Sequence, residues 1–353
     1  MTSHTQRRVI IVSEFHRGST SWELTEGLAS LGWDVHILDL RNYLTSWRAK
    51  GLRAIRRVLT PYIIRSMHAE LAGLNESIRP THILNLKGAY FSTELISVLK
   101  GGGAKVVMFY PDFHFEHDGV VPESFPYYDG ISTTKSFQLP YLRQHCPNAR
   151  IAFIPHGYSD TIHKPLKVKS EEADYDADIG YVGNYSPYKE AWLDAVAEAF
   201  PTVKMRIVGS VWAKKCRSPR LKSAIYGDVL YGTSFVRSIQ SSKINIAVHM
   251  GPHANGWQDL TSTRTFEIPA CKGFMLHIDN PEVRALYDVG TEIDVFSSPG
   301  ELIDRIRQYL PLAEKRRSMI EAAYGRTVPA YGLRARAKIL SDFLDKIHNE
   351  ESL

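Results

Sequence analysis

Cysteine is scarce in this sequence, and no apolar run is long. The 353 residues contain three cysteines, Cys146, Cys216 and Cys271, which form neither a disulfide framework nor a paired metal-ligand motif. This scarcity suggests a reducing compartment. No apolar run reaches the ~18 residues that a membrane-spanning helix needs, and the polar residues 1–8 lead directly into a strand instead of forming a signal peptide. These absences predict a cytoplasmic protein.

A strong charge of either sign is also lacking. The chain has 43 Lys and Arg against 38 Asp and Glu, a net charge of +5. That mild excess suits anionic substrates or an anionic membrane surface and is too weak to indicate nucleic acid by itself. The length exceeds what one core usually serves, so two domains are expected.

The pattern of the first half is typical of a parallel, doubly wound sheet. An apolar run at 9–12 is followed by a loop, a helical pattern and a second strand at 35–39. In such sheets, ligands bind at the loops that follow the carboxyl ends of the strands. Gly18 lies in the first such loop, where a glycine lets a ligand approach the backbone closely.

A loop at 111–118 follows the central strand predicted at 105–110, and it is rich in acids and histidines. Asp112 and His114 are candidate general bases on the acceptor side of a reaction. A polar loop without catalytic function is the alternative. Because alternating residues on a loop have no fixed facing, no metal site is predicted there.

Residues 41–79 form a helical, basic pattern. Seven of its cations are interleaved with apolar side chains between 41 and 65, and they are Arg41, Arg48, Lys50, Arg53, Arg56, Arg57 and Arg65. An amphipathic basic helix can lie on anionic lipid, which predicts peripheral membrane contact through 41–65, at the inner face of the membrane. A solvated face over a core is the commoner outcome for such a pattern, and a nucleic-acid groove is the least favoured.

A polar, acidic stretch at 167–178 has no apolar periodicity and is read as a linker. The strand and helix pattern then restarts. We therefore predict an N-terminal domain at 1–165 and a C-terminal domain at 175–330. A last helix, 331–353, has few partners in its own half and is expected to cross back onto the first domain.

The stretch 261–276 is read as a loop, a short helix, a glycine stop and a buried strand. Pro269 has no backbone N–H, so the helix is expected to begin at about Thr265 or Phe266. Hydroxyl groups then cluster at the positive end of the helix dipole beside Arg264, a favourable place for a diphosphate. Glu267, about one turn in, can accept hydrogen bonds from the vicinal hydroxyls of a ribose. A capped helix with two surface charges is the alternative.

Several motifs occur in an order that resembles a known family. They are the segments 264–271 with Gly273 and Phe274, 178–184, 133–135, and 154–157 with 163–165. The sequence is similar to the CgeB-like bacterial glycosyltransferases, which are related to the retaining group 1 (family 4) enzymes. The resemblance implies an α/β fold of two Rossmann-like, doubly wound domains facing a cleft, the GT-B fold.

The resemblance also implies roles for individual residues. Glu267 would hold the ribose of the donor, and Asp259, eight positions earlier, would lie near the transferred sugar. The diphosphate would be contacted by Thr263, Arg264 and Thr265. Other matched donor-side or cleft positions are Gly183, Asn184, Lys189, His156 and Gly18. Lys272 replaces a glycine that is common in this turn of the family.

The predicted function is transfer of a sugar from a nucleoside-diphosphate sugar to a hydroxyl of a saccharide, a lipid-linked or another acceptor. No cofactor and no metal are expected, and retention of the anomeric configuration is favoured. Inversion would require Asp112, His114 or Glu14 as a base. The alternatives are a nucleotide-sugar epimerase or hydrolase, a non-catalytic nucleotide-sugar binding protein, and a glycosyltransferase acting on modified nucleic acid, although a nucleic-acid partner is not expected.

Overall fold

The computed structural model describes residues 7–44, 53–166 and 175–349. The chain divides into two compact units. Unit 1 comprises Met1–Pro155 and Leu333–Leu353, and unit 2 comprises His156–Gly332. The first crossing between the units thus falls at Pro155, before the stretch 165–175 where the sequence pattern placed it.

Unit 1 is built on a six-stranded sheet in the order β2-β1-β3-β4-β5-β6, with every pair parallel. Its strands are β1 Arg8–Ser13, β2 Asp34–Asp39, β3 His82–Leu86, β4 Lys105–Tyr110, β5 Gly130–Thr133 and β6 Arg150–Phe153. The central strands are buried on both faces, because helices cover both sides of a parallel sheet. The doubly wound sheet expected from the sequence is confirmed for this unit.

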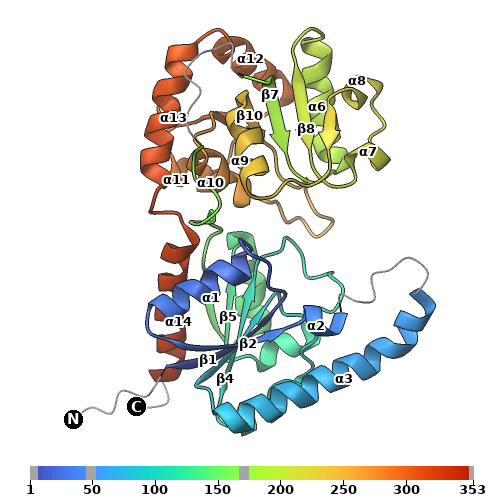
Figure 1. The fold of residues 1–353 in the computed structure, drawn as a ribbon, viewed down its shortest axis with the longest axis vertical. Helices are drawn as coiled ribbons and strands as arrows, with labels where there is room; N and C mark the ends of the chain where they lie inside the picture. Colours follow the sequence, from blue (N-terminus) through green and yellow to red (C-terminus); the bar gives the residue numbers. More distant parts are fainter. Residues whose placement is uncertain (1–6, 45–52, 167–174, 350–353) are drawn as a thin grey trace. The chain divides into compact units, whose positions relative to one another are not determined.

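The last helix of the chain belongs to unit 1. Helix α14 (Leu333–Asn349) packs against α1 (Thr20–Ser30), as Figure 1 shows. A Cβ added at Gly27 would lie 2.4 Å from Cβ of Ala337, so the two helices approach closely at this glycine. Trp33 donates its indole N–H to the Ser341 hydroxyl at 2.9 Å. The predicted return of the C-terminal helix to the first domain is confirmed.

In the basic segment 41–79, which the sequence pattern predicts to be helical, the described residues form two helices. Helix α2 (Arg41–Leu44) is followed by α3 (Arg53–Ile78), and 45–52 lie outside the described residues. Three further elements complete the helical layers of unit 1. They are α4 (Thr93–Gly101), a 3-10 helix at Pro122–Tyr127, and α5 (Leu139–His145) with a 3-10 turn at Ser136–Gln138 before it.

Unit 2 has its own six-stranded parallel sheet in the order β12-β11-β10-β7-β8-β9. Its strands are β7 Ala177–Val182, β8 Met205–Val208, β9 Ile225–Gly227, β10 Ser242–Ala247, β11 Met275–Ile278 and β12 Asp294–Phe296. The apolar pattern at 229–232 predicts a further short strand, and this prediction is wrong, because the strand in this part of the unit is β9, which precedes it. Val229 and Tyr231 are 41% and 80% exposed, and Leu230 between them is partly buried against the core, so this run lies on a surface loop.

Helices cover both faces of the second sheet. On one face, α6 (Pro187–Ala199) and α12 (Pro299–Tyr309) bury Trp192, Leu193 and Ile306. The other face is covered by α9 (Thr233–Gln240), α10 (Thr263–Ala270), α11 (Pro281–Leu286) and α13 (Ala313–Thr327). Two short helices, α7 (Trp212–Lys215) and α8 (Pro219–Lys222), lie between β8 and β9.

Candidate functional site

The strand order of unit 2 identifies where a ligand would bind. Starting from β7, the chain adds β8 and β9 on one side and β10, β11 and β12 on the other. The direction of winding therefore reverses between β7 and β10. Ligands of open parallel sheets bind outside the carboxyl ends of the strands at such a switch point. The loops at 183–186 and 248–262 and the start of α10 follow these two strands.

Helix α10 begins earlier than the sequence indicated. Ser262 is its N-cap, and a capping box joins the Ser262 and Thr265 side chains to each other's backbone. Pro269 lies inside the helix, so the expectation that it must lie in the first turn or outside was wrong. The carbonyl of Thr265, which would have accepted a bond from residue 269, accepts one from the Tyr287 hydroxyl at 3.0 Å. Tertiary packing thus satisfies the group that proline leaves without its helical partner.

The turn after α10 closes with Lys272 in the left-handed region, at φ 57°. The amide of Lys272 donates to the carbonyl of Pro269, and that of Gly273 donates to the carbonyl of Ile268 at 2.9 Å. A tight turn therefore forms with lysine in place of glycine. The Lys272 ammonium is held by Glu321 of α13.

The hydroxyl groups around the start of α10 do not all face outward, which corrects the sequence-based expectation. Thr265 is fully buried, and Thr261 is 2% exposed with its hydroxyl donating to Glu282 at 2.9 Å. The Thr263 hydroxyl accepts from Arg264 at 3.3 Å. A diphosphate contact by the Thr265 side chain would require its bonds to break, because its hydroxyl is engaged inside the protein.

Arg264 lies at the carboxyl end of β7. Its Nε donates to the carbonyl of Val182, the last residue of that strand, at 2.8 Å. The guanidinium lies over the Phe235 ring, 4.8 Å from its centroid, and forms an ion pair with Glu267. A backbone carbonyl, an aromatic face and a carboxylate therefore hold the charge at the switch point of the sheet.

Glu267 has a second neighbour that the analysis of single residues did not identify. His163 Nε2 lies 3.8 Å from Glu267 Oε1. Because His163 Nδ1 accepts a bond from the Ser159 amide at 2.9 Å, the proton of a neutral ring is on Nε2 and faces the carboxylate. Both carboxylate oxygens of Glu267 thus face partners, Arg264 on one side and His163 on the other.

Lys189 is a buried cation near this pair. It lies in the first turn of α6 and is 7% exposed, and its Nζ donates to the Asn184 carbonyl at 3.1 Å. Burial lowers the pKa of Lys189 from 10.5 to about 8, the nearby Asp259 carboxylate opposes this, and the positive charge of Arg264 adds to it. Asp259 is itself buried. Two cations and two carboxylates thus meet at the carboxyl ends of β7 and β10.

The first loop of unit 2 is held by short contacts. The Gly183 carbonyl accepts from the Trp212 indole at 2.8 Å, and the Asn184 side-chain oxygen accepts from the Ser210 amide at 3.4 Å. At Gly209, an added Cβ would lie 1.9 Å from the Gly183 carbonyl oxygen, so the two loops touch through bare backbone. His156, at the start of unit 2, is 8% exposed.

A buried pair of histidines, His249 and His277, is hydrogen-bonded to the first turn of α10. The sequence alone did not indicate this pair. His277 Nδ1 lies 2.7 Å from the Ile278 carbonyl, which can only accept, so this nitrogen carries the proton. Burial lowers the pKa of His277 to about 4, so the ring is neutral and its Nε2 can only accept. It accepts from His249 Nε2 and from the Thr265 hydroxyl, both at 2.9 Å. The ends of β10 and α10 are thereby tied to β11.

The remaining predicted residues belong to unit 1. Gly18 has φ 78° in the loop before α1, a conformation that favours glycine. Asp112 and His114 follow β4, where the Gln138 amide donates to the Asp112 carbonyl at 3.0 Å and the Tyr110 hydroxyl donates to the His114 carbonyl at 2.5 Å. These bonds fix the backbone of the loop. Among the described residues, no group of three or more His, Cys, Asp or Glu side chains could hold a metal ion.

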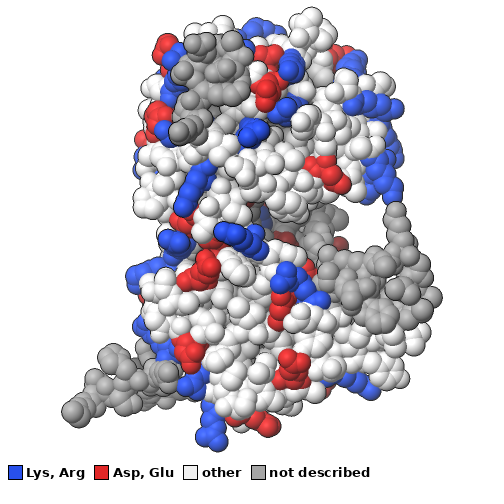
Figure 2. Space-filling view, viewed as in Figure 1, with Lys and Arg blue, Asp and Glu red and all other residues white. Residues whose placement is uncertain are grey.

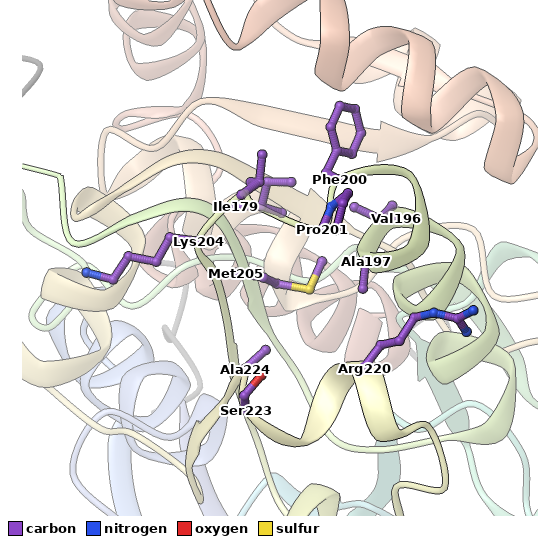
Figure 3. Close-up of a pocket in the computed structure, with 11 residues that line it drawn as sticks. Ile179, Val196, Ala197, Phe200, Pro201, Lys204, Met205, Arg220, Ser223 and Ala224 are labelled. Atoms are coloured by element: carbon purple, nitrogen blue, oxygen red, sulfur yellow. The ribbon is translucent and has the colours of Figure 1, made fainter.

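A cavity of about 220 Å³ in unit 2 lies away from these charges. It is lined by Ile179 at the start of β7, Met205 at the start of β8 and Phe200 after α6, with Arg220 at its side (Figure 3). These residues mark the amino ends of the strands. The cavity therefore lies at the amino ends of the strands, whereas α/β proteins bind their ligands at the carboxyl ends.

Comparison with known proteins shows which family model and which folds this chain resembles. Residues 188–342 match a family model described as glycosyl transferase-like. No curated protein matches the chain. A glycosyltransferase from Rickettsia africae ESF-5 superimposes with a TM-score of 0.70 at 13% identity, over 98% of this chain and 100% of that one.

Two further solved structures share the fold. Sucrose-phosphate synthase from Thermosynechococcus elongatus has a TM-score of 0.64 at 11% identity, over 97% of this chain and 99% of that one. Anabaena HepE in complex with UDP has a TM-score of 0.63 at 10% identity, over 96% of this chain and 100% of that one. This chain therefore has the α/β fold of the GT-B glycosyltransferases, and most of its second unit lies in a glycosyltransferase-like segment.

Proposed function

We propose that the chain is a glycosyltransferase of the CgeB-like kind, and that unit 2 holds a nucleoside-diphosphate sugar as donor. The observation that carries this proposal is the convergence of Arg264 and the buried Lys189 at the carboxyl ends of β7 and β10, beside the start of α10. Two cations and the positive end of a helix dipole form a site suited to a diphosphate.

The named ligands of a structural neighbour support this choice of donor. HepE from Anabaena, which shares the fold at 10% identity, has been solved with UDP and with UDP-glucose. A nucleoside diphosphate with an attached sugar is therefore a suitable first ligand to test on this chain.

Donor binding would change the partner of Arg264. In the structure, its guanidinium is paired with Glu267. A diphosphate offers the guanidinium a more highly charged, bidentate partner. Once released, the Glu267 carboxylate could accept hydrogen bonds from the vicinal hydroxyls of a ribose, with His163 still facing its other oxygen. A single change of partner at Arg264 thus frees the guanidinium for the diphosphate and the Glu267 carboxylate for the ribose.

The reaction would break the bond between the anomeric carbon of the sugar and the diphosphate oxygen. Negative charge then develops on the diphosphate, where Arg264, Lys189 and the N-terminus of α10 would stabilise it without a metal ion. Asp259, which interacts with Lys189, would lie near the transferred sugar. We propose retention of configuration: the acceptor oxygen bonds to the anomeric carbon as the diphosphate leaves, and the acceptor's hydroxyl proton passes to the departing diphosphate. Asp112 and His114 of unit 1 are the candidate general bases for the inverting alternative.

Thermal unfolding with a panel of nucleoside diphosphates and their sugars tests the donor site. A ligand at about 100 times its dissociation constant stabilises the folded state by about 2.7 kcal/mol. We expect at least one nucleotide to raise Tm, and Arg264→Ala and Glu267→Ala to abolish the rise. Arg220→Ala is the matched control, because Arg220 is also ion-paired in unit 2, with Asp194 and Glu198.

Two outcomes would count against the proposal. An unchanged Tm with every nucleotide would contradict the proposed donor site. An equal loss of the Tm rise in Arg220→Ala would show that the effect of Arg264→Ala and Glu267→Ala is not specific to the site. Turnover then separates the enzyme from a binding protein. With the stabilising nucleotide sugar and a mixed set of saccharide acceptors, NMR should show a glycosidic product that retains the anomeric configuration, whereas a binding protein yields none.

A further inference from the structure

Among its described side chains, helix α3 of unit 1 carries apolar residues on two faces, one buried in the unit and one exposed. Met67 and Leu71, in its C-terminal half, are 1% and 0% exposed and pack into unit 1. Val58 and Tyr62, nearer its N-terminus, are 66% and 65% exposed. Figure 1 shows α3 as a long helix along one side of the unit.

The helical repeat places these pairs on opposite sides. Val58 precedes Met67 by nine residues, and Tyr62 precedes Leu71 by nine. At ~3.6 residues per turn, nine residues correspond to about two and a half turns, so each exposed residue points away from the buried one. Burial within unit 1 does not account for a valine and a tyrosine on this side of α3, because both side chains stay exposed there.

The charge of the surrounding sequence is of one sign. Between Asp39 and Glu70 the chain has seven Lys and Arg and no acidic residue. Arg65, one turn after Tyr62, is exposed on α3. Elsewhere on the face in Figure 2, Lys and Arg are mixed with Asp and Glu. An exposed apolar stripe within a purely cationic segment is complementary to a surface that is both apolar and anionic.

We propose that the stripe formed by Val58 and Tyr62, flanked by Arg65, docks unit 1 onto an anionic lipid bilayer. The two apolar side chains would enter the region between headgroups and acyl chains, and the Arg65 guanidinium would face the lipid phosphates. A nucleic acid would engage the cations and gain nothing from valine, so the exposed apolar pair favours lipid. Among the described residues no helix has the length and apolar character needed to cross a bilayer, so docking would be at the surface.

Flotation of the full chain with vesicles tests this proposal. We expect binding to vesicles of phosphatidylglycerol mixed with phosphatidylcholine, much weaker binding to phosphatidylcholine alone, and release at high salt. The double variant Val58→Glu, Tyr62→Glu should lower binding to the mixed vesicles by about tenfold or more. Val98→Glu is the matched control, because Val98 is a 58% exposed apolar residue on another helix of unit 1.

Three results would overturn the proposal. The first is equal binding of the double variant and the native chain at an unchanged Tm, which shows that the stripe is not involved. The second is tight binding of duplex DNA, with no vesicle binding, that the double variant retains, which assigns the cations to nucleic acid. The third is a dimer in light scattering that the double variant abolishes while vesicles never bind, which assigns the stripe to a second copy of the chain.

Discussion

Lys189 provides the sharpest test of the site, because the fold holds its charge at a cost. Burial lowers its pKa from 10.5 to about 8. That difference corresponds to about 3 kcal/mol by which the folded protein disfavours the charged form. Lys189→Met keeps the length of the side chain and removes the charge. At pH 7 we expect the variant to be more stable to unfolding by up to about 3 kcal/mol, a figure that already includes the attraction between Lys189 and Asp259 that the variant loses.

The pH dependence separates this effect from ordinary repacking. Between pH 8 and 10.5 the unfolded native chain binds the Lys189 proton and the folded chain does not, so this residue makes stability rise with pH. The variant should lack that rise. The difference in unfolding free energy between Lys189→Met and the native chain should therefore shrink to near zero above pH 10.5. Urea unfolding measured from pH 6 to pH 11 gives both curves.

Function should change in the opposite direction to stability. If Lys189 is retained to bind a diphosphate, Lys189→Met should weaken UDP binding about tenfold or more in calorimetric titration. Affinity of the native chain should also fall as pH rises above 8, where the ammonium loses its proton. A variant that is no more stable at pH 7 and binds UDP as the native chain does would refute the reasoning.

Two further predictions concern the support of α10. Burial lowers the pKa of His277 to about 4, so its contribution to stability is complete above about pH 6.5 and is lost towards pH 4, by up to about 3 kcal/mol. His277→Gln should therefore weaken the fall in unfolding free energy between pH 6.5 and pH 4. An unaltered fall would argue against a neutral ring. Tyr287→Phe should cost about 1–2 kcal/mol, because it removes the donor that serves the Thr265 carbonyl. Pro269→Ala should recover part of that loss by restoring a helical N–H, and a double-mutant cycle with no coupling would contradict this account.

Much of the fold follows from the periodicity of the sequence. Parallel strands buried on both faces read as short apolar runs, as β1, β4 and β10 do. In contrast, β9 at Ile225–Gly227 is short and partly exposed, whereas the more apolar run at 229–231 is a surface loop. Periodicity reports burial, and this edge strand buries too little to produce a signal.

The candidate site was less predictable, for reasons visible in particular residues. Pro269 was expected to set the start of α10, but Tyr287, 18 positions later, satisfies the carbonyl that the proline leaves without its bond. The direction of the Thr265 hydroxyl depends on His277 on a neighbouring strand. Local sequence indicated that hydroxyls and charges gather at 259–267. Which of them face inward depends on contacts between distant segments.

A crystal structure of the chain with UDP would show directly whether unit 2 holds the donor at the switch point of its sheet. We expect the diphosphate at the N-terminus of α10, with the Arg264 guanidinium contacting it in place of the Glu267 carboxylate. UDP bound elsewhere, with the pair of Arg264 and Glu267 intact, would contradict this expectation.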